Sequence, residues 1–468
     1  MKIPLINPES QGVYPQNFYF VKETEDGRPA MRGTPGLKRW LDLSATMPYG
    51  VRALHVMDDK LYSVMGDKFY AITDPQNYTE NSVSMTKSSG AVMMADNGSQ
   101  VMLIQVGVNG YIYKSSDLTL NLITDSDFPT PGSLAMQDYY FFVTQYNADR
   151  IWQSTLLDGT SWPNDGYGEA EIRPDRAVRA ISAGGELWVL NELTYEVFRN
   201  IGGTSNFSFQ TIPGAFHETG CSAADSAATE HESLFWFDDN RMVRMSQGYS
   251  SKIVSPDELN RLFAGYGTVS DAKGFTYVDR GSSFYVLTFP TENITWAYNI
   301  ASGTESPIWH QWASFPSDGR HRSNCYAYFD GKMLVGDHQQ GIIYELDPDT
   351  YDDDDHEIRS VLTLPSVITG GKEIPHNRLQ VDMKTGVGLT NDHSVLNVGS
   401  NPVVGMEYSD DRKNTWANLR SREIGKRGKY KTRVFWTRLG RSENRAYRFT
   451  ITDPVEREIY GINLNEQQ

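Results

Sequence analysis

Side chains that bind metals or act as nucleophiles are scattered through this 468-residue chain. Three of the nine histidines, His310, His321 and His338, lie in one stretch but lack the spacing of a metal site. Cys221 and Cys325 are far apart, which predicts two thiols in a protein made in a reducing compartment. The sequence has no glycine-rich phosphate loop, no zinc-binding helix motif and no Cys-x-x-Cys pair. We therefore predict no catalytic residues, no cofactor, no metal centre and no enzymatic activity.

Carboxylates are the remaining candidates for chemistry. Glycoside hydrolysis needs two acids facing one sugar, so Glu186, Glu192 or Asp238 would have to converge. The acidic run 347–357 could bind calcium, because hard cations prefer clustered carboxylates. It lacks the glycine and the bidentate glutamate that a calcium loop places at fixed positions, and we interpret it as an interdomain linker. Calcium binding stays open as the alternative.

One short motif is similar to the Asp-box, a hairpin motif of sialidases and other propellers. Ser409, Asp411, Thr415 and Trp416 have its spacing, although Lys413 stands where that motif has glycine. In proteins with this motif, the Ser and Asp side chains close the turn and the Trp packs beneath it, remote from catalysis. We expect the same structural role here, in a turn between two strands.

The segment 412–448 is basic, with 13 Lys/Arg against 2 Asp/Glu. Because the whole chain has a formal net charge of −16, the remainder carries about −27. Basic residues on a strand often only solubilise a sheet. The separation of the two charge signs favours a docking surface instead, since arginine suits bidentate contacts with carboxylates. The candidate interface residues, several of them close to Trp436 in sequence, are Arg412, Arg433, Arg438, Arg441 and Arg445.

The acidic balance also bears on nucleic acids. It argues against general nucleic-acid binding by the whole surface. A protein that touches passing DNA without holding it would present such a negative face. DNA binding through the basic segment alone remains a competing hypothesis.

A repeated hairpin pattern must position these residues. Short apolar runs, each followed by a turn and a partner strand, recur every 39 to 50 residues. The seven runs begin at Leu61, Val101, Tyr140, Leu187, Leu234, Phe284 and Met333. This period is typical of propeller blades, and six to eight blades would fit. A β-sandwich or two separate β-domains is the alternative.

The domain organisation follows from this pattern. We predict an all-β chain with an N-terminal segment at 1–45, either an arm or a ring-closing strand. A β-propeller follows at 46–350, with a short helix at 255–266 capped by Ser255. A C-terminal β-sandwich with a basic face occupies 351–468, with strands at 431–439 and 446–451 and Trp436 in its core. No apolar run is long enough for a signal peptide or a membrane span, so we expect synthesis in the cytoplasm.

Five segments stand out in their order along the chain: RGTPGLKR at 32–39, VGVNG at 106–110, ELWV at 186–189, YEVF at 195–198 with Gly202, and RVFWTRLGR at 433–441. In this order they resemble segments of the tail-hub (nozzle) proteins of short-tailed phages of enteric bacteria. These proteins are also called packaged-DNA stabilisation or head-completion proteins. The helix at 255–266 falls where that family has a short helix.

The resemblance implies a structural virion protein without enzymatic activity. It implies a hexameric ring in the phage tail, below the portal and adaptor proteins and assembled in the host cytoplasm. The ring would extend the DNA exit channel, help retain packaged DNA, and anchor a tailspike or tail fibre and a needle or plug. DNA would pass through its lumen without sequence-specific binding. A glycan-binding or glycan-hydrolysing propeller, adhesin-like or sialidase-like, stays open as the alternative.

Overall fold

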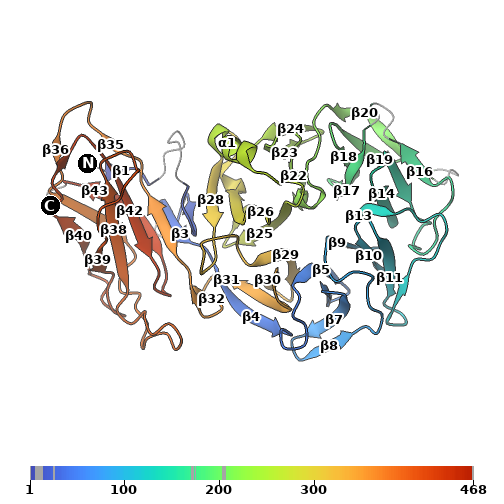
Figure 1. The fold of residues 1–468 in the computed structure, drawn as a ribbon, viewed down its shortest axis with the longest axis horizontal. Coiled ribbons are helices and arrows are strands. Elements are labelled where there is room, and N and C mark those ends of the chain that lie inside the picture. Colours follow the sequence, from blue (N-terminus) through green and yellow to red (C-terminus); the bar gives the residue numbers. More distant parts are fainter. Residues whose placement is uncertain are drawn as a thin grey trace.

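The computed structural model describes residues 2–5, 14–24, 27–169, 173, 175–202 and 207–465. These residues form two bodies that lie side by side, a ring of β-sheets and a β-sandwich (Figure 1). The predicted all-β fold, a propeller with a C-terminal β-sandwich, is confirmed. Within the described part, the only α-helix is α1 (Asp257–Gly265), and η1 (Ala224–Ser226) and η2 (Ile300–Ser302) are 3-10 turns. No described helix is long and apolar enough to cross a membrane.

Seven antiparallel sheets of the described residues make up the ring, and we number them as blades one to seven in chain order (Figure 1). Blades one to three consist of β5 (Val51–Met57), β6 (Lys60–Met65), β7 (Lys68–Asp74) and β8 (Asn77–Glu80); β9 (Val92–Asp96), β10 (Gln100–Gln105), β11 (Asn109–Lys114) and β12 (Thr119–Leu122); and β13 (Pro131–Gln137), β14 (Tyr140–Gln145), β15 (Arg150–Gln153) and β16 (Tyr167–Glu169). Blades four to six consist of β17 (Ala177–Ala183), β18 (Glu186–Asn191), β19 (Tyr195–Asn200) and β20 (Phe209–His217); β21 (Ala228–Glu230), β22 (Ser233–Phe237), β23 (Val243–Gln247) and β24 (Ser250–Ile253); and β25 (Lys273–Asp279), β26 (Ser282–Phe289), β27 (Ile294–Asn299) and β28 (Ile308–Trp312).

The seven hairpins seen in the sequence are the second and third strands of each blade. These strands are covered on both faces by neighbouring blades, so they read as continuous apolar runs. In β10, for example, every residue is buried. The inner strands line the centre of the ring, and β17, β25 and β29 contain several half-buried residues, so their apolar pattern is weaker.

Tight turns join the first and second strands of most blades. A two-residue turn with positive φ at both residues matches the twist of a hairpin, and Asp, Asn and Gly tolerate it best. The turn residues with positive φ at both positions are Asp58 and Asp59, Asp138 and Tyr139, Gly184 and Gly185, Arg280 and Gly281, and Asp330 and Gly331. Local turn chemistry therefore repeats along with the hydrophobic pattern.

Blade seven closes the ring with a strand from the other end of the chain. It contains β29 (Ser323–Phe329), β30 (Lys332–Asp337) and β31 (Ile342–Asp347), and its outer strand is β4 (Gly36–Asp42). β4 pairs antiparallel with β31, and the inner strand β29 contacts β5 of blade one. At Gly36 a Cβ atom would stand 2.4 Å from the Asp352 carbonyl oxygen, so this close approach requires glycine.

The sandwich draws strands from both ends of the chain. One sheet has the order β2-β3-β43-β37-β40, with β1 also pairing with β43. The other has the order β34-β42-β38-β39, with β35 on β42, and β36 pairs with β41 beside it. Phe18 and Met31 pack with Trp436 in the sandwich core. The strands are β1 (Lys2–Ile3), β2 (Phe18–Val21), β3 (Ala30–Gly33), β34 (Ser360–Thr363), β35 (Val367–Ile368), β36 (Ile374–Pro375), β37 (Arg378–Met383), β38 (Val403–Ser409), β39 (Arg420–Glu423), β40 (Val434–Thr437), β41 (Arg441–Ser442), β42 (Asn444–Ile451) and β43 (Glu458–Leu464).

The acidic run lies where the two bodies meet. Its strands β32 (Asp352–Asp353) and β33 (His356–Glu357) extend the sheet of blade seven, and Asp353 pairs with Leu37 of β4. The run is therefore folded into the propeller edge in addition to connecting the bodies. The predicted N-terminal segment divides in the same region, since β1 to β3 belong to the sandwich and β4 to the ring.

Candidate functional site

The Asp-box-like turn follows the end of β38 and is closed by its own side chains. The Asp411 carboxylate accepts hydrogen bonds from Thr415 Oγ1 at 2.6 Å, Thr415 N at 2.9 Å and Ser409 Oγ at 2.7 Å. These bonds, the one from the Thr415 hydroxyl above all, lower the pKa of Asp411 to about 2. Lys413 N donates to Ser409 Oγ at 2.9 Å, and its φ of 72° is the conformation for which the motif uses glycine. The bonding pattern is that of a structural turn.

Trp416 differs from the expectation of a tryptophan buried beneath the turn. It lies in the loop after the turn, is half-buried, and is not part of a strand. The Arg448 guanidinium carbon lies 4.1 Å from the centre of its ring, a cation–π contact. Trp436, by contrast, is buried in the sandwich core with 1% of its surface exposed.

Arg445 is a core residue, which corrects its assignment to the candidate interface. Only 2% of it is exposed, and it forms a two-pronged ion pair with Asp410, with Nε–Oδ1 and Nη2–Oδ2 distances of 2.6 Å. Its Nη1 also donates to the Leu439 carbonyl, and its guanidinium stacks 4.1 Å from the ring centre of Tyr408. A charge held in this way fixes the loop and is unavailable to a partner.

The other four candidate residues, Arg412, Arg433, Arg438 and Arg441, are exposed. Arg412 and Arg441 line a notch of about 510 Å³ whose wall also contains acids. Arg441 Nε lies 3.6 Å from Glu373 Oε2. The notch is therefore of mixed charge, and the residues that line it are Glu373, Asp410, Asp411, Arg412, Arg441, Ser442, Glu443 and Asn444.

A more uniform positive surface lies where the edge strands of the two sheets meet. Trp436 Nε1 donates to the Arg420 carbonyl at 2.9 Å, and Arg422 Nε donates to the Phe435 carbonyl at 3.0 Å, so β39 and β40 are joined. We call the exposed basic residues of β39, of the loop after it and of the start of β40 the basic edge: Arg420, Arg422, Lys426, Arg427, Lys429, Lys431 and Arg433. Figure 1 places β39 and β40 on the side of the sandwich away from the propeller.

Six of these seven residues were missed as individual site residues. The sequence signal that could have identified them is in β39 (Arg420–Glu423). Its residues are all polar, with no alternation of apolar and polar side chains, and all four are exposed. Charged residues along an edge strand also block pairing with other sheets, so the basic edge has a structural use of its own.

The acids proposed for glycoside hydrolysis do not converge. Glu186 and Glu192 lie at and just beyond opposite ends of β18, roughly 20 Å apart by strand geometry, and the reaction needs about 5–10 Å. Glu192 pairs with Arg176 at 2.5 Å. Asp238 is buried and pairs with Arg244 at 2.6 Å, with its other oxygen held by backbone N–H groups. This geometry gives no support to hydrolysis.

The acidic run meets His393 of the sandwich. Ligand atoms of Asp352, Asp355 and His393 lie within 4.8 Å of one another. However, His393 Nδ1 accepts hydrogen bonds from the backbone N–H groups of Val395 and Leu396. His393 Nε2 lies 3.4 Å from Asp352 Oδ2 and 3.7 Å from Asp355 Oδ1. These contacts bring the acidic run at the propeller edge against the sandwich.

The three histidines of the predicted scattered group are mostly buried and neutral. Burial lowers the pKa of His310 and of His321 to about 3 and also lowers the pKa of His338. His310 Nε2 accepts the indole N–H of Trp312 at 3.0 Å. Cys221 and Cys325 are free thiols, and burial raises the pKa of each to about 12, so neither is an activated nucleophile.

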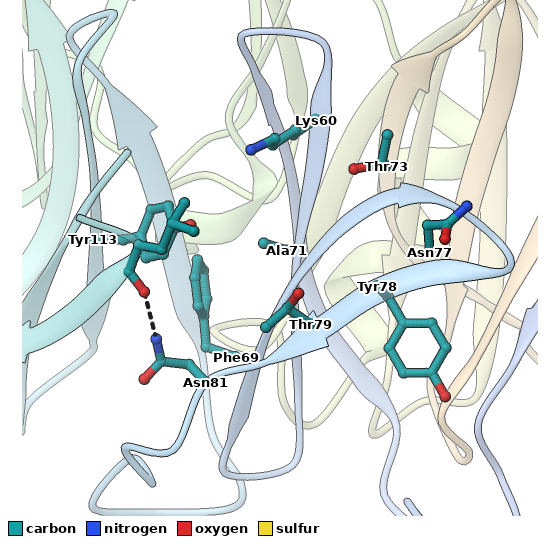
Figure 2. Close-up of a pocket in the computed structure, with 10 residues that line it drawn as sticks. Lys60, Phe69, Ala71, Thr73, Asn77, Tyr78, Thr79, Asn81 and Tyr113 are labelled. Atoms are coloured by element: carbon teal, nitrogen blue, oxygen red, sulfur yellow. Dashed lines mark hydrogen bonds between the residues drawn. The ribbon is translucent and has the colours of Figure 1, made fainter. Parts of the chain in front are cut away.

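A groove also opens on the outer rim between blades one and two (Figure 2). Phe69 and Tyr113 form its buried floor, and Tyr78 is 43% exposed at its edge. The side-chain amide of Asn81 donates to the Leu118 carbonyl at 3.4 Å, the dashed line in Figure 2. The described lining, which is Lys60, Phe69, Ala71, Thr73, Asn77, Tyr78, Thr79, Asn81, Tyr113 and Leu118, includes no carboxylate. The groove offers aromatic and amide contacts without catalytic acids.

Two solved structures with a similar arrangement share little sequence with this chain. The chain is similar to the computationally designed Ika8 protein at 10% identity and a TM-score of 0.41, over 66% of this chain and 99% of that one. It is similar to PorZ, a surface component of the type-IX secretion system of Porphyromonas gingivalis, at 9% identity and a TM-score of 0.40, over 74% of this chain and 44% of PorZ. No curated protein matches the chain.

Family models give a direct result. Residues 1–351 match the model described as Bacteriophage P22 Gp10, beta-propeller, and residues 361–466 match the model described as Bacteriophage P22 Gp10, beta-sandwich. The first span covers the ring together with the sandwich strands β1 to β3, and the second covers nearly all of the C-terminal part of the sandwich. The chain therefore belongs to the bacteriophage P22 Gp10 family, a family of structural proteins of short-tailed phages.

Proposed function

We propose that this protein forms the hub ring of a short phage tail. The ring, a hexamer below the portal and adaptor proteins, would extend the DNA exit channel and help retain packaged DNA. It would also anchor a tailspike or tail fibre and a needle or plug. The observation that carries the proposal is the family match over residues 1–351 and 361–466.

Charge separation supports assembly into a ring. A closed ring of identical chains uses a head-to-tail contact, in which each chain presents two different surfaces. The basic edge lies on one side of the sandwich, while the rest of the chain outside 412–448 carries about −27. Contact between the basic edge of one copy and an acidic surface of a neighbour or of another tail protein is electrostatically favourable.

Copy number tests the ring directly. We would purify particles from cells that express this chain together with the other tail proteins and quantify it with isotope-labelled peptides. About six copies per particle are expected from the resemblance to tail-hub proteins. Particles that lack the chain, or that retain their DNA equally well when it is deleted, would contradict the proposal.

Charge reversal tests the docking surfaces. Lys429→Glu with Lys431→Glu changes the basic edge, and Arg438→Glu with Arg441→Glu changes the predicted interface residues. Both double variants should fold normally and fail to enter particles. Lys87→Glu with Arg199→Glu, which makes the same charge change at exposed propeller positions, is the matched control. If the variants assemble normally but lose salt-dependent DNA binding, the basic edge binds DNA instead.

Glycan binding is the second candidate function, and the groove of Figure 2 favours it. An exposed tyrosine beside side-chain amides, as at Tyr78, Asn77 and Asn81, can stack on and hydrogen-bond to a sugar. The purified protein would be tested for binding to host polysaccharides, with Tyr78→Ala as the variant. Binding that is lost in Tyr78→Ala would support this function, and no detectable binding would remove it.

A further inference from the structure

A cavity of about 250 Å³ lies at the centre of the propeller. It is lined by residues of the inner strands β5, β9, β17, β25 and β29, by η1 and by Ala227, which follows η1. Its charged lining residues are Arg52, Arg179, Lys273 and Asp225, so three cations face a single carboxylate. Met93, Phe275 and Tyr326 supply apolar wall, which strengthens electrostatic interactions inside the cavity.

Arg52 contributes charge but few available donors. Its guanidinium donates to the carbonyls of Gly90 at 2.9 Å, Gly66 at 2.7 Å, and Lys87 and Ser89 at 2.8 Å. Burial lowers the pKa of Arg52 to about 10, which still leaves it charged at neutral pH. Arg52 therefore holds the loop at 87–90 and adds a fixed positive charge to the cavity wall.

Arg179 differs from Arg52, because no hydrogen bonds to backbone carbonyls are found for its guanidinium among the described residues. The Nε atom is buried and has no hydrogen-bond acceptor among the described residues. Nη1 contacts the Met93 sulfur, a weak acceptor. An unpaired buried guanidinium N–H is unfavourable, and an oxygen atom placed in the cavity would remove that penalty. The acid Asp225 lies 3.8 Å from Lys273 Nζ and also interacts electrostatically with Arg179, so one carboxylate offsets part of two positive charges.

We infer that the central cavity of the propeller binds a small oxyanion, a phosphate or a carboxylate, with Arg179 as the anchoring donor and Lys273 as the second cation. A guanidinium presents parallel N–H donors that match two oxygens of either anion. The excess of positive charge around the cavity favours an anion over a neutral ligand. This inference is independent of the proposed tail function.

Isothermal titration calorimetry of the full chain tests the site. Inorganic phosphate and acetate would be titrated separately in chloride buffer of matched ionic strength. We expect one oxyanion per chain for at least one of the two anions. Arg179→Met should weaken the binding at least about tenfold, the loss of one charge-assisted hydrogen bond. Lys273→Met should also weaken it. Arg199→Met, at an exposed position of blade four, is the matched control and should bind as the unaltered protein does.

Folding of the variants is checked by circular dichroism, since Arg179 packs inside the ring. If Arg179→Met does not fold, Arg179→Lys keeps the charge but removes the paired donors, and it should bind more weakly than the unaltered protein. Failure of both anions to bind would overturn the inference. So would binding that is unchanged in a folded Arg179 variant, because the anion would then occupy another site.

Discussion

Trp436 is the single side chain on which we expect the sandwich to depend most. It is 1% exposed, lies 5.8 Å from Phe449 between ring centres, and donates its indole N–H to the Arg420 carbonyl. Trp436→Ala should lower the free energy of unfolding by about 3–5 kcal/mol, through a cavity and an unpaired carbonyl. Urea unfolding followed by circular dichroism measures the change. Trp416→Ala, at a half-buried loop position, is the control and should lower the free energy of unfolding by less than Trp436→Ala does. Equal losses would contradict the core assignment.

Asp353 makes the stability of the folded chain depend on pH, and the direction of that dependence follows from its burial. Burial raises its pKa to about 7; Oδ2 accepts from Ser314 Oγ at 3.1 Å, and Oδ1 has no partner. The folded chain therefore keeps a proton that the unfolded chain releases above pH ~4. The contribution of Asp353 to stability falls as pH rises from about 4 to 7.

Asp353→Asn should remove this contribution. The variant should gain stability relative to the unaltered protein as pH rises from 5 to 7, by about 3 kcal/mol, and little more from 7 to 8. Thermal unfolding at each pH measures the difference. Asp59→Asn, at an exposed hairpin turn, is the matched control and should show no such trend. A difference that does not change with pH would contradict the assignment.

The N-terminal segment is the element that joins the two bodies, and Asn17 is its central contact. Its side-chain amide donates to the carbonyls of Ala313 at 2.9 Å and Arg359 at 3.0 Å, and its Oδ1 accepts from Ala313 N at 2.9 Å. Asn17 also has a φ of 52°, which asparagine tolerates better than most residues. One side chain thereby links the end of β28 to the residue before β34.

Asn17→Ala should destabilise the chain by about 2–4 kcal/mol, because it leaves buried backbone groups unpaired at the junction. Limited proteolysis should then cut near residue 359 sooner than in the unaltered protein, and thermal unfolding gives the size of the effect. Asn17→Asp keeps an acceptor for Ala313 N but sets a carboxylate oxygen against the Ala313 and Arg359 carbonyls, so it should be at least as destabilising as Asn17→Ala. A variant as stable and as resistant as the unaltered chain would refute this role.

The α-helix illustrates how a local pattern can be correct while its contacts are not. The pattern of acids and apolar residues predicted the helix, and α1 covers Asp257–Gly265. Ser255 was expected to cap it, and that detail is wrong. Pro256 holds the cap position without a side-chain bond, while the Ser255 hydroxyl accepts the backbone N–H of Val243 in β23 at 2.9 Å. The Ser255 hydroxyl also donates to Asn260 Oδ1 of α1 at 2.5 Å, so Ser255 contacts a helix side chain instead of the backbone N–H groups that a cap would satisfy.

Acid sensitivity belongs to the whole molecule, because buried histidines lie in both bodies. Burial lowers the pKa of His310 and His321 in the ring to about 3 and that of His376 in the sandwich to about 4. The unfolded chain binds protons near pH 6.5 that the folded chain does not bind. Stability from these residues is present above about pH 6.5 and is lost as pH falls toward 4.

We expect the unfolding temperature to decrease steadily from pH 6.5 to pH 4. Each histidine contributes about 1.4 kcal/mol per pH unit in this window, and the three together outweigh the opposite effect of Asp353. Differential scanning calorimetry across the window measures the trend. His310→Gln with His321→Gln should flatten it, whereas His231→Gln, at an exposed turn, should leave it unchanged. A slope that the double variant does not alter would contradict this assignment.

The sequence by itself determined the all-β class, the repeated hairpins and the short helix. These features depend on residues close together in the chain: alternating or continuous apolar runs, turn residues, and acids at a helix start. The bonding of the turn from Ser409 to Thr415 was predictable for the same reason. The segments that resemble the tail-hub family also indicated the family, since their order along the chain can be read without any structural information.

The tertiary structure decided which distant segments pair. β4 closes the ring against β31, and β3 joins β43, across more than 300 residues in each case. Such pairings depend on register and packing between segments whose local patterns fit many partners. Exposure was decided in the same way: charge alone could not show that Arg445 is buried against Asp410 while the residues of β39 face solvent. Side-chain environment is a property of the packed fold, because neighbours far apart in sequence set it.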